Sequence, residues 1–132
     1  MVQIWIDGAA RPNPGKGGIG VVIRGESWDY TLSEKLLGKV TNNQAEYCAL
    51  IAALFELIRN KCCGKEIEVL SDSSMLVGQM AEELEIDKGG SYVPDYLKAK
   101  NLSEYFSGIN FRWISRKENA EANLLASEGV SK

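Results

Sequence analysis

Residues 43–60, NQAEYCALIAALFELIRN, decide the fold class, because their hydrophobic period differs from that of the sequence before them. The large apolar side chains recur at spacings of three and four residues, at Leu50, Ile51, Leu54, Leu57 and Ile58. This spacing puts a broad apolar stripe on one side of a helix of about four or five turns. We therefore predict a long helix here that packs on a sheet.

Three strands are predicted before this helix. Residues 2–7, VQIWID, alternate and are rich in strand-forming residues, and residues 19–25 and 28–38 show further strand patterns. Between the first two strands lies GAARPNPGKGG, residues 8–18, a segment rich in glycine and proline that we interpret as a loop. The short connections favour antiparallel pairing of the three strands.

The residues after the helix predict two more strands, which alternate with helices. The strands are residues 65–72 and 109–115, and the helices are residues 73–84, 93–106 and 116–130, with a break at 87–91. The element order is therefore β-β-β-α-β-α-α-β-α. This order predicts an α/β fold of one domain, residues 1–132, in which helices flank a mixed sheet.

The composition limits the class of protein. The chain has 132 residues, of which 45% are hydrophobic, and a formal net charge of −3. No apolar run approaches the roughly 20 residues that span a bilayer, and no signal peptide is visible, so we expect a cytoplasmic protein without a membrane partner. The acidic balance predicts that any binding to nucleic acid depends on local contacts or on bound metal.

The cysteine spacing and the absence of histidine exclude several kinds of site. Cys48, Cys62 and Cys63 show neither an even disulfide framework nor metal-ligand spacing, so we expect reduced thiols. The chain contains no histidine. This absence excludes Ser-His-Asp and Cys-His catalysis as well as histidine metal ligands.

Three acidic residues stand where strands end or where the long helix begins. Asp7 ends the first strand, Glu46 lies in the first turn of the helix, and Asp72 ends the fourth strand. The simpler interpretations are an Asp-Gly turn, a capping box from Asn43 to Glu46, and a helix N-cap. Together the three fit one site, because the first and fourth strands can lie side by side. Carboxylates so close repel unless a cation lies between them, and oxygen ligands favour Mg²⁺ or Mn²⁺.

Four motifs occur in the order found in one family of nucleases. They are DGAARPNPGKGGIGVVI (7–23), TNNQAEYCALIAAL (41–54), SDS (71–73) and NAEANLLA (119–126). In this joint pattern the chain resembles, nearly from end to end, the ribonuclease H type 1 family. The resemblance implies a five-stranded mixed sheet, three antiparallel strands and then two parallel ones, flanked by helices. It also implies a monomer that cuts the RNA strand of RNA–DNA hybrids with two Mg²⁺ ions held by four carboxylates.

The resemblance implies a role for particular positions. Asp7, Glu46 and Asp72 correspond to three of the four carboxylates that bind metal and catalyse. The positions implied to contact the hybrid are Asn13, Asn42, Asn43 and either Ser73 or Ser74 in the minor groove, and Thr41 at a DNA phosphate. Amides and hydroxyls suit this role, because the 2′-hydroxyl that distinguishes RNA from DNA both donates and accepts hydrogen bonds. The alternative for each Asn is a loop or cap residue.

The fourth carboxylate position falls on Asn123, which departs from the family pattern. Glu121 projects about 200° away around the helix and cannot substitute. An Asn offers a metal its carbonyl oxygen but no negative charge, so the second ion should bind less tightly and activity should shift toward higher metal concentration or Mn²⁺. Three explanations are open: a natural enzyme with weakened activity, a deliberate substitution that keeps the shape, and a natural relative without catalysis.

Two further features of the family are missing. Residues 82–100 mix acidic and basic side chains, so the basic protrusion by which some members hold substrate is absent, and weaker binding is expected. The loop before the last helix, SRKEN (115–119), lacks the mobile histidine of many members. The role of that histidine is missing, or is taken by Glu118 or by solvent.

Two other hypotheses remain. One is a module of the same fold that binds hybrid or structured RNA without cutting it, and the other is a different chemistry, as in exonucleases, resolvases and transposases. The TNN and NPG segments favour the hybrid-cutting branch. Trp5, Trp28 and Trp113 fall in predicted strands, and we interpret them as packing residues.

Overall fold

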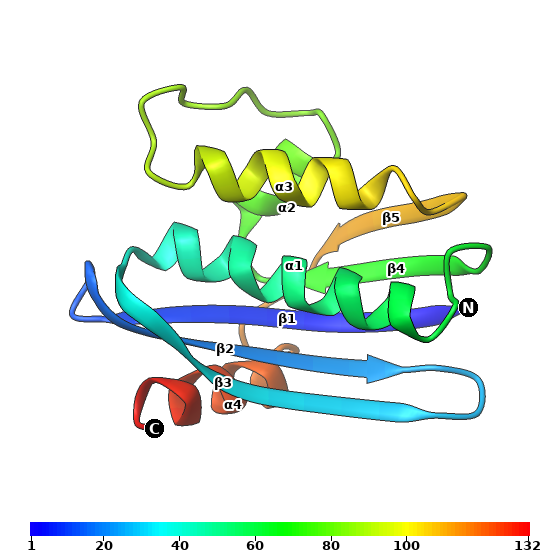
Figure 1. The fold of residues 1–132 in the computed structure, drawn as a ribbon, viewed down its shortest axis with the longest axis horizontal. Helices are drawn as coiled ribbons and strands as arrows, with labels where there is room; N and C mark the ends of the chain where they lie inside the picture. The colour runs from blue at the N-terminus through cyan, green and yellow to red at the C-terminus, as the bar shows by residue number, and fades with distance from the viewer.

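The computed structural model describes residues 1–132 and contains one five-stranded sheet and four helices (Figure 1). The strands are β1 (Val2–Arg11), β2 (Gly15–Arg24), β3 (Asp29–Val40), β4 (Glu66–Ser71) and β5 (Gly108–Trp113), and the helices are α1 (Asn42–Arg59), α2 (Ser74–Met80), α3 (Val93–Ser103) and α4 (Ala120–Val130). The strand order across the sheet is β3-β2-β1-β4-β5. β2 pairs antiparallel with β1 and β3, whereas β4 pairs in parallel with β1 and β5. The predicted α/β class and five-stranded mixed sheet are confirmed.

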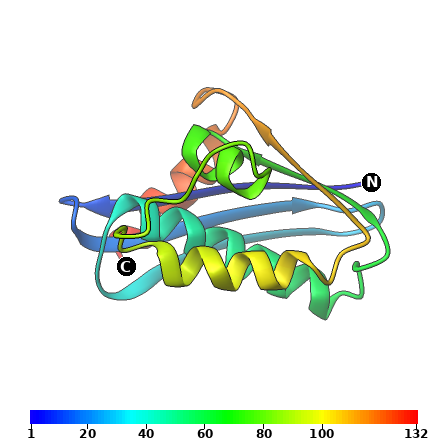
Figure 2. The same cartoon turned by 90° about the horizontal axis from the view of Figure 1, so that it is seen from above.

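Helices cover both faces of this sheet (Figures 1 and 2). α1 packs across β1 and β2 with α3 beside it, and α4 packs on the opposite face against β1, β2 and β3. None of the four helices has the length and apolar character that crossing a membrane would require.

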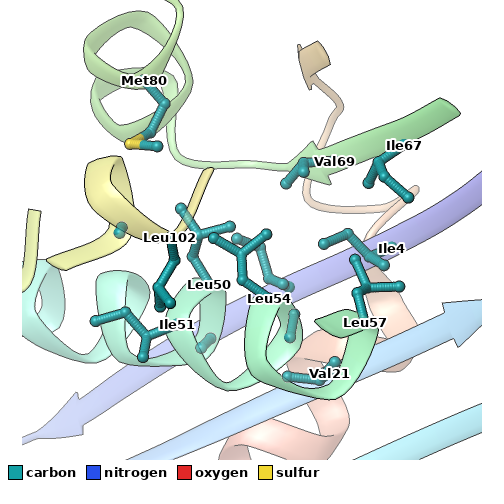
Figure 3. Close-up of a cluster of buried hydrophobic side chains, with 14 of the residues drawn as sticks. Ile4, Val21, Leu50, Ile51, Leu54, Leu57, Ile67, Val69, Met80 and Leu102 are labelled. Atoms are coloured by element: carbon teal, nitrogen blue, oxygen red, sulfur yellow. The ribbon is translucent and has the colours of Figure 1, made fainter. Parts of the chain in front are cut away.

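The main core lies between α1 and the sheet, as Figure 3 shows for part of it. Its fully buried side chains come from alternate strand positions and from one side of the helix, and include Ile4, Ile6, Val21, Ile23, Leu50, Leu54 and Leu57. Burial of each such side chain contributes about 1.5–3 kcal/mol to folding. The apolar stripe predicted for residues 43–60 is therefore the surface that holds α1 against the strands.

The opposite helix, α4, approaches the sheet closely because β2 carries glycines on that face. A Cβ atom on Gly18 would overlap the α4 backbone at Ala126 and Val130, and one on Gly20 would overlap the carbonyl oxygen of Ala122. Any larger residue at either position would push α4 away from the sheet. The glycines thus allow a side chain of α4 to reach the strand next to β2, which is β1.

The interpretation of residues 8–18 as a loop was wrong. β1 continues to Arg11 and β2 begins at Gly15, so only Pro12–Pro14 form the turn. The backbone pairing of β1 with β2 extends as far as Arg11 opposite Lys16. This pairing satisfies the backbone hydrogen bonds and overrides the weak strand propensity of glycine and alanine.

Three predicted helices were too long. The helix predicted over 73–84 ends at Met80, because the N–H groups of Glu83 and Leu84 both turn back to the carbonyl oxygen of Gly78. α3 ends at Ser103 and α4 begins at Ala120, so each is shorter than its predicted range. These changes leave the element order as predicted.

Candidate active site

A cavity of about 560 Å³ opens where β1 and β4 meet the start of α1. Its lining includes the four residues predicted for the metal site, Asp7, Glu46, Asp72 and Asn123. They come from β1, α1, the residue after β4, and α4. Both helix layers and the middle of the sheet are therefore needed to form the site.

The parallel register of β1 and β4 brings Asp7 and Asp72 together. The last pair in this register is Ile6 with Ser71, so the two aspartates occupy the next positions. Oxygen atoms of Asp7, Glu46 and Asp72, one from each side chain, lie within 4.8 Å of one another. The prediction that these two strands lie side by side is confirmed. The Asp-Gly turn is wrong, because Asp7 lies within β1.

Glu46 reaches the cluster because α1 lies against β1 at Gly8, where a Cβ atom would overlap the helix backbone. The helix is capped by Thr41, whose Oγ1 accepts a hydrogen bond from the Gln44 N–H at 3.1 Å. Gln44 Oε1 in turn accepts from the Thr41 N–H at 2.8 Å, which completes a capping box. The alternative of a capping box from Asn43 to Glu46 is therefore wrong, and the Glu46 carboxylate faces the cavity.

Asn123 contributes a hydrogen-bond donor to the cluster. Its Nδ2 donates to Asp7 Oδ2 at 2.9 Å. Four residues earlier, at the residue that precedes α4, Asn119 Nδ2 donates to the carbonyl oxygen of Ile6 at 2.9 Å. Two amides on one side of α4 thus hold neighbouring residues of β1, and they fix the position of Asn123 beside Asp7.

The carboxylates repel one another where little water reaches them. Burial raises the pKa of Asp7, and the charge on Asp72 raises it further. Burial, followed by the charge on Asp7, raises the pKa of Glu46 well above its ordinary value. Glu46 Oε2 is buried and has no hydrogen-bond partner. A buried carboxylate oxygen without a donor is costly, and a bound cation would satisfy it.

The residues predicted to contact substrate divide between the cavity and its surroundings. Asn42, Asn43 and Ser73 line the cavity, whereas Asn13, Thr41 and Ser74 do not. Asn13 Oδ1 accepts from the Asn42 N–H at 2.9 Å, and Asn42 Oδ1 accepts from the Ala10 N–H at 2.8 Å. These two bonds join the β1–β2 turn to the start of α1, so the predicted groove residues lie on one continuous surface.

Ser73 caps helix α2 at the edge of the cavity. Its Oγ accepts a hydrogen bond from the Leu76 N–H at 3.1 Å. The alternative of Asp72 as the N-cap is therefore wrong, which leaves the Asp72 carboxylate for the cluster. Ser74 is the first residue of α2 and is exposed.

Besides the small residues of β1, three residues with large side chains line the cavity and were not predicted: Arg11, Trp113 and Arg116. Trp113 was interpreted as a packing residue, but its side chain is 53% exposed and its Nε1 donates to the carbonyl oxygen of Asp72 at 3.1 Å. In the loop before α4, Arg116 faces the cavity. Glu118 instead accepts a hydrogen bond from the Ser115 N–H at 3.0 Å and does not line the cavity. No sequence pattern marks Arg11 or Arg116, because loop and turn arginines are usually solvated.

Comparison with known proteins gives the same assignment over nearly the whole chain. The profile of a protein family described as reverse transcriptase-like matches residues 6–129. A bifunctional protein of Mycobacterium tuberculosis is 35% identical over 131 residues, which are 98% of this chain and 35% of the relative. The chain thus spans about a third of the length of that relative. A ribonuclease H of Actinobacillus succinogenes is 41% identical over 143 residues, covering 98% of this chain and 90% of the relative.

Solved structures agree with the sequence comparison. The crystal structure of a ribonuclease H1 isolated from compost, in complex with an RNA/DNA hybrid, matches with a TM-score of 0.89 and 34% identity. The match covers 99% of this chain and 97% of that chain. Sequence, fold and site geometry together place the chain in the ribonuclease H type 1 family.

Proposed function

We propose that this protein is a metal-dependent endonuclease that hydrolyses the RNA strand of RNA–DNA hybrids. One observation carries the proposal: oxygen atoms of Asp7, Glu46 and the half-buried Asp72 lie within 4.8 Å of one another, and the buried Glu46 Oε2 lacks any hydrogen-bond donor. A protein does not keep such a cluster for stability, because its members repel one another. Family membership, and a relative solved with an RNA/DNA hybrid, support the choice of substrate.

The donor set fits a divalent cation such as Mg²⁺, with Mn²⁺ as a substitute. Asp7, Glu46 and Asp72 offer only oxygen atoms, which Mg²⁺ and Mn²⁺ prefer. Two ions, when bound, would supply activation of a water molecule and stabilisation of the leaving oxygen. The three carboxylates would hold the metal, and the burial of Asp7 and of Glu46 Oε2 would strengthen their attraction for it.

Asn123 makes this site weaker toward a second ion. Its Nδ2 donates to Asp7, so only its carbonyl oxygen remains for a cation, and it carries no negative charge. In the metal-free protein the amide instead relieves the repulsion that Asp7 feels from its neighbours. We therefore expect activity that needs a higher metal concentration than a site with four carboxylates would need.

Recognition of the RNA strand is assigned to the polar surface beside the carboxylates. Asn42 and Asn43 line the cavity, and Asn13 is hydrogen-bonded to the backbone of Asn42. Their amides can both donate to and accept from a 2′-hydroxyl. Thr41 lies farther along the same surface, where it would meet a DNA phosphate, while Ser73 or Ser74 extends the surface past Asp72.

We propose a monomer, because the four residues predicted for the metal site converge within a single chain. The three cysteines are free, which agrees with a reducing compartment such as the cytoplasm.

The test is cleavage of an end-labelled RNA–DNA hybrid during titration with Mg²⁺ and with Mn²⁺, beside RNA duplex and DNA duplex. We expect the chain to cut only the RNA of the hybrid. Asp7→Asn should abolish cleavage, whereas Asp29→Asn, which changes an exposed carboxylate outside the cavity, should not.

The Asn123→Asp variant distinguishes the remaining outcomes. If only this variant cuts, position 123 is the disabled part of an otherwise complete site. If neither chain cuts at any metal concentration, the nuclease proposal is wrong, and a module that binds hybrid or RNA without cutting replaces it.

A further inference from the structure

One row of side chains, on α4 and the residue that precedes it, contacts β1 at three points. Asn119, Asn123 and Ser127 are four residues apart, which places them on the same side of the helix. Asn119 and Asn123 bind Ile6 and Asp7, as described above. Ser127 Oγ accepts a hydrogen bond from Arg11 Nη2 at 2.8 Å. The same helix that positions Asn123 therefore also positions a guanidinium group.

Arg11 lines the cavity at a distance from the carboxylates. Asp7 and Arg11 lie four residues apart on β1, so both point to the α4 side of the sheet. A strand rises about 3.3 Å per residue, which separates their backbones by about 13 Å. Arg11 therefore meets a different part of an extended ligand from the part that lies at the carboxylates.

The arginines that line the cavity differ from the other arginines in having no ion-pair partner. Arg24, Arg59 and Arg112 each form an ion pair with a glutamate, and none of them lines the cavity. Arg11 and Arg116 are the two arginines without a carboxylate partner, and both line the cavity. An arginine whose only side-chain bond is to a serine keeps its charge and most of its donors for an anionic ligand.

We propose that Arg11, held in place by Ser127, binds a backbone phosphate of the nucleic acid at a distance from the phosphate at the carboxylates. The inference rests on the proposed function, because it assumes a nucleic-acid substrate. Guanidinium groups match phosphate oxygens in a forked geometry. In a chain of net charge −3, this contact supplies attraction that overall charge does not.

The experiment measures the binding of a fluorescently labelled RNA–DNA hybrid by anisotropy over a series of salt concentrations. Ca²⁺ replaces the catalytic metal so that binding is measured without cleavage. The variants are Arg11→Gln, Arg11→Lys and Ser127→Ala. Arg24→Gln is the matched control, because Arg24 also donates a side-chain hydrogen bond to α4, to Glu121 at 3.1 Å, but outside the cavity.

Each variant has its own expected result. Arg11→Gln should weaken binding and reduce the slope of log affinity against log salt by about 0.7–0.9, the value for one phosphate contact. Arg11→Lys and Ser127→Ala should weaken binding while the slope stays near that of the parent, because the charge remains. Arg24→Gln should bind like the parent. Thermal unfolding of all four variants confirms that each is folded.

The outcomes separate this inference from the proposed function. If the parent binds hybrid and Arg11→Gln binds with the same affinity and slope, the role of Arg11 is refuted while the nuclease proposal stands. An equal loss in Arg24→Gln would also refute it, because the effect would then be general charge. If the parent binds but does not cut, and Arg11→Gln loses the contact, Arg11 keeps its role and only catalysis fails. If the parent does not bind hybrid at all, both proposals are wrong.

Discussion

The substitution Asn123→Asp should destabilise the metal-free protein and strengthen its response to divalent metal. The change removes the donor that binds Asp7 Oδ2 at 2.9 Å and puts a fourth carboxylate in its place. A hydrogen bond to a charged group contributes about 1.5–3 kcal/mol. The repulsion between full charges about 3 Å apart is about 5.5 kcal/mol at an effective dielectric constant of about 20.

The net effect is smaller than the sum of these two figures. Asn123 is only half-buried, and Asp7, whose pKa is already raised, can relieve the repulsion by taking up a proton. We expect a loss of about 2–4 kcal/mol in the free energy of unfolding in EDTA, from the two terms above. For a chain of this size the loss lowers Tm by about 8–16 °C.

Thermal unfolding followed by circular dichroism, in EDTA and across Mg²⁺ and Mn²⁺ titrations, measures both effects. Bound metal stabilises the folded state in proportion to the logarithm of its affinity, so each tenfold gain in affinity restores up to about 1.4 kcal/mol. The Tm difference between the chains should therefore shrink as metal is added. Asn101→Asp, which adds the same charge on the exposed surface of α3, is the control. Equal stability of Asn123→Asp and its parent in EDTA would refute the reasoning. A Tm difference between the two chains that stays the same at every metal concentration would refute it as well.

Three further predictions concern pH, the loop before α4 and the buried polar contacts of α1. Because the pKa of Glu46 is raised in the folded protein, the metal-free chain should be more stable below the ordinary glutamate pKa and should lose that stability as pH rises through the raised value. Glu46→Gln should therefore flatten the dependence of Tm on pH in EDTA. An unchanged dependence of Tm on pH would contradict this prediction. Arg116→Ala should slow hybrid cleavage whereas Glu118→Ala should not, since only Arg116 lines the cavity, and steady-state rates for the two variants decide the point. Tyr47→Phe should cost about 1–3 kcal/mol in urea unfolding, because it leaves Gln79 Oε1 without the donor that binds it at 2.6 Å; a loss below that range would mean that water replaces the hydroxyl.

The sequence predicted the elements that have a clear hydrophobic period. The stripe in residues 43–60 became the buried side of α1, and the chain order led to the parallel pairing that joins Asp7 with Asp72. The adjacency of these two parallel strands follows from the topology, so this part of the site could be inferred from the sequence. The extent of the β1–β2 pairing could not be inferred, because the glycines and prolines of residues 8–18 favour a loop, whereas the two strands pair as far as Arg11 opposite Lys16.

The missed cavity residues share a physical reason. Arg11, Trp113 and Arg116 lie in a glycine-rich strand end, at the end of an edge strand and in a loop, where sequence gives no period from which to infer direction. Whether such a side chain faces the site depends on contacts with distant elements. Arg11 is directed by Ser127, which is 116 residues away along the chain. The caps Thr41 and Ser73 were likewise hidden, because several neighbouring polar residues could each have capped the helix.

Position 123 is where the stability of the metal-free fold and the affinity for metal have opposite requirements. The glycines of β2 and the Asn119 contact hold α4 so near β1 that the residue at 123 must either donate to Asp7 or repel it. An amide donates, and so the free protein is stabilised, while a carboxylate needs a cation to be tolerated. A chain with Asn123 that cuts the hybrid would show that three carboxylates are enough when substrate and metal bind together. A chain that cuts only as Asn123→Asp would show that this amide keeps the fold stable at the cost of catalysis.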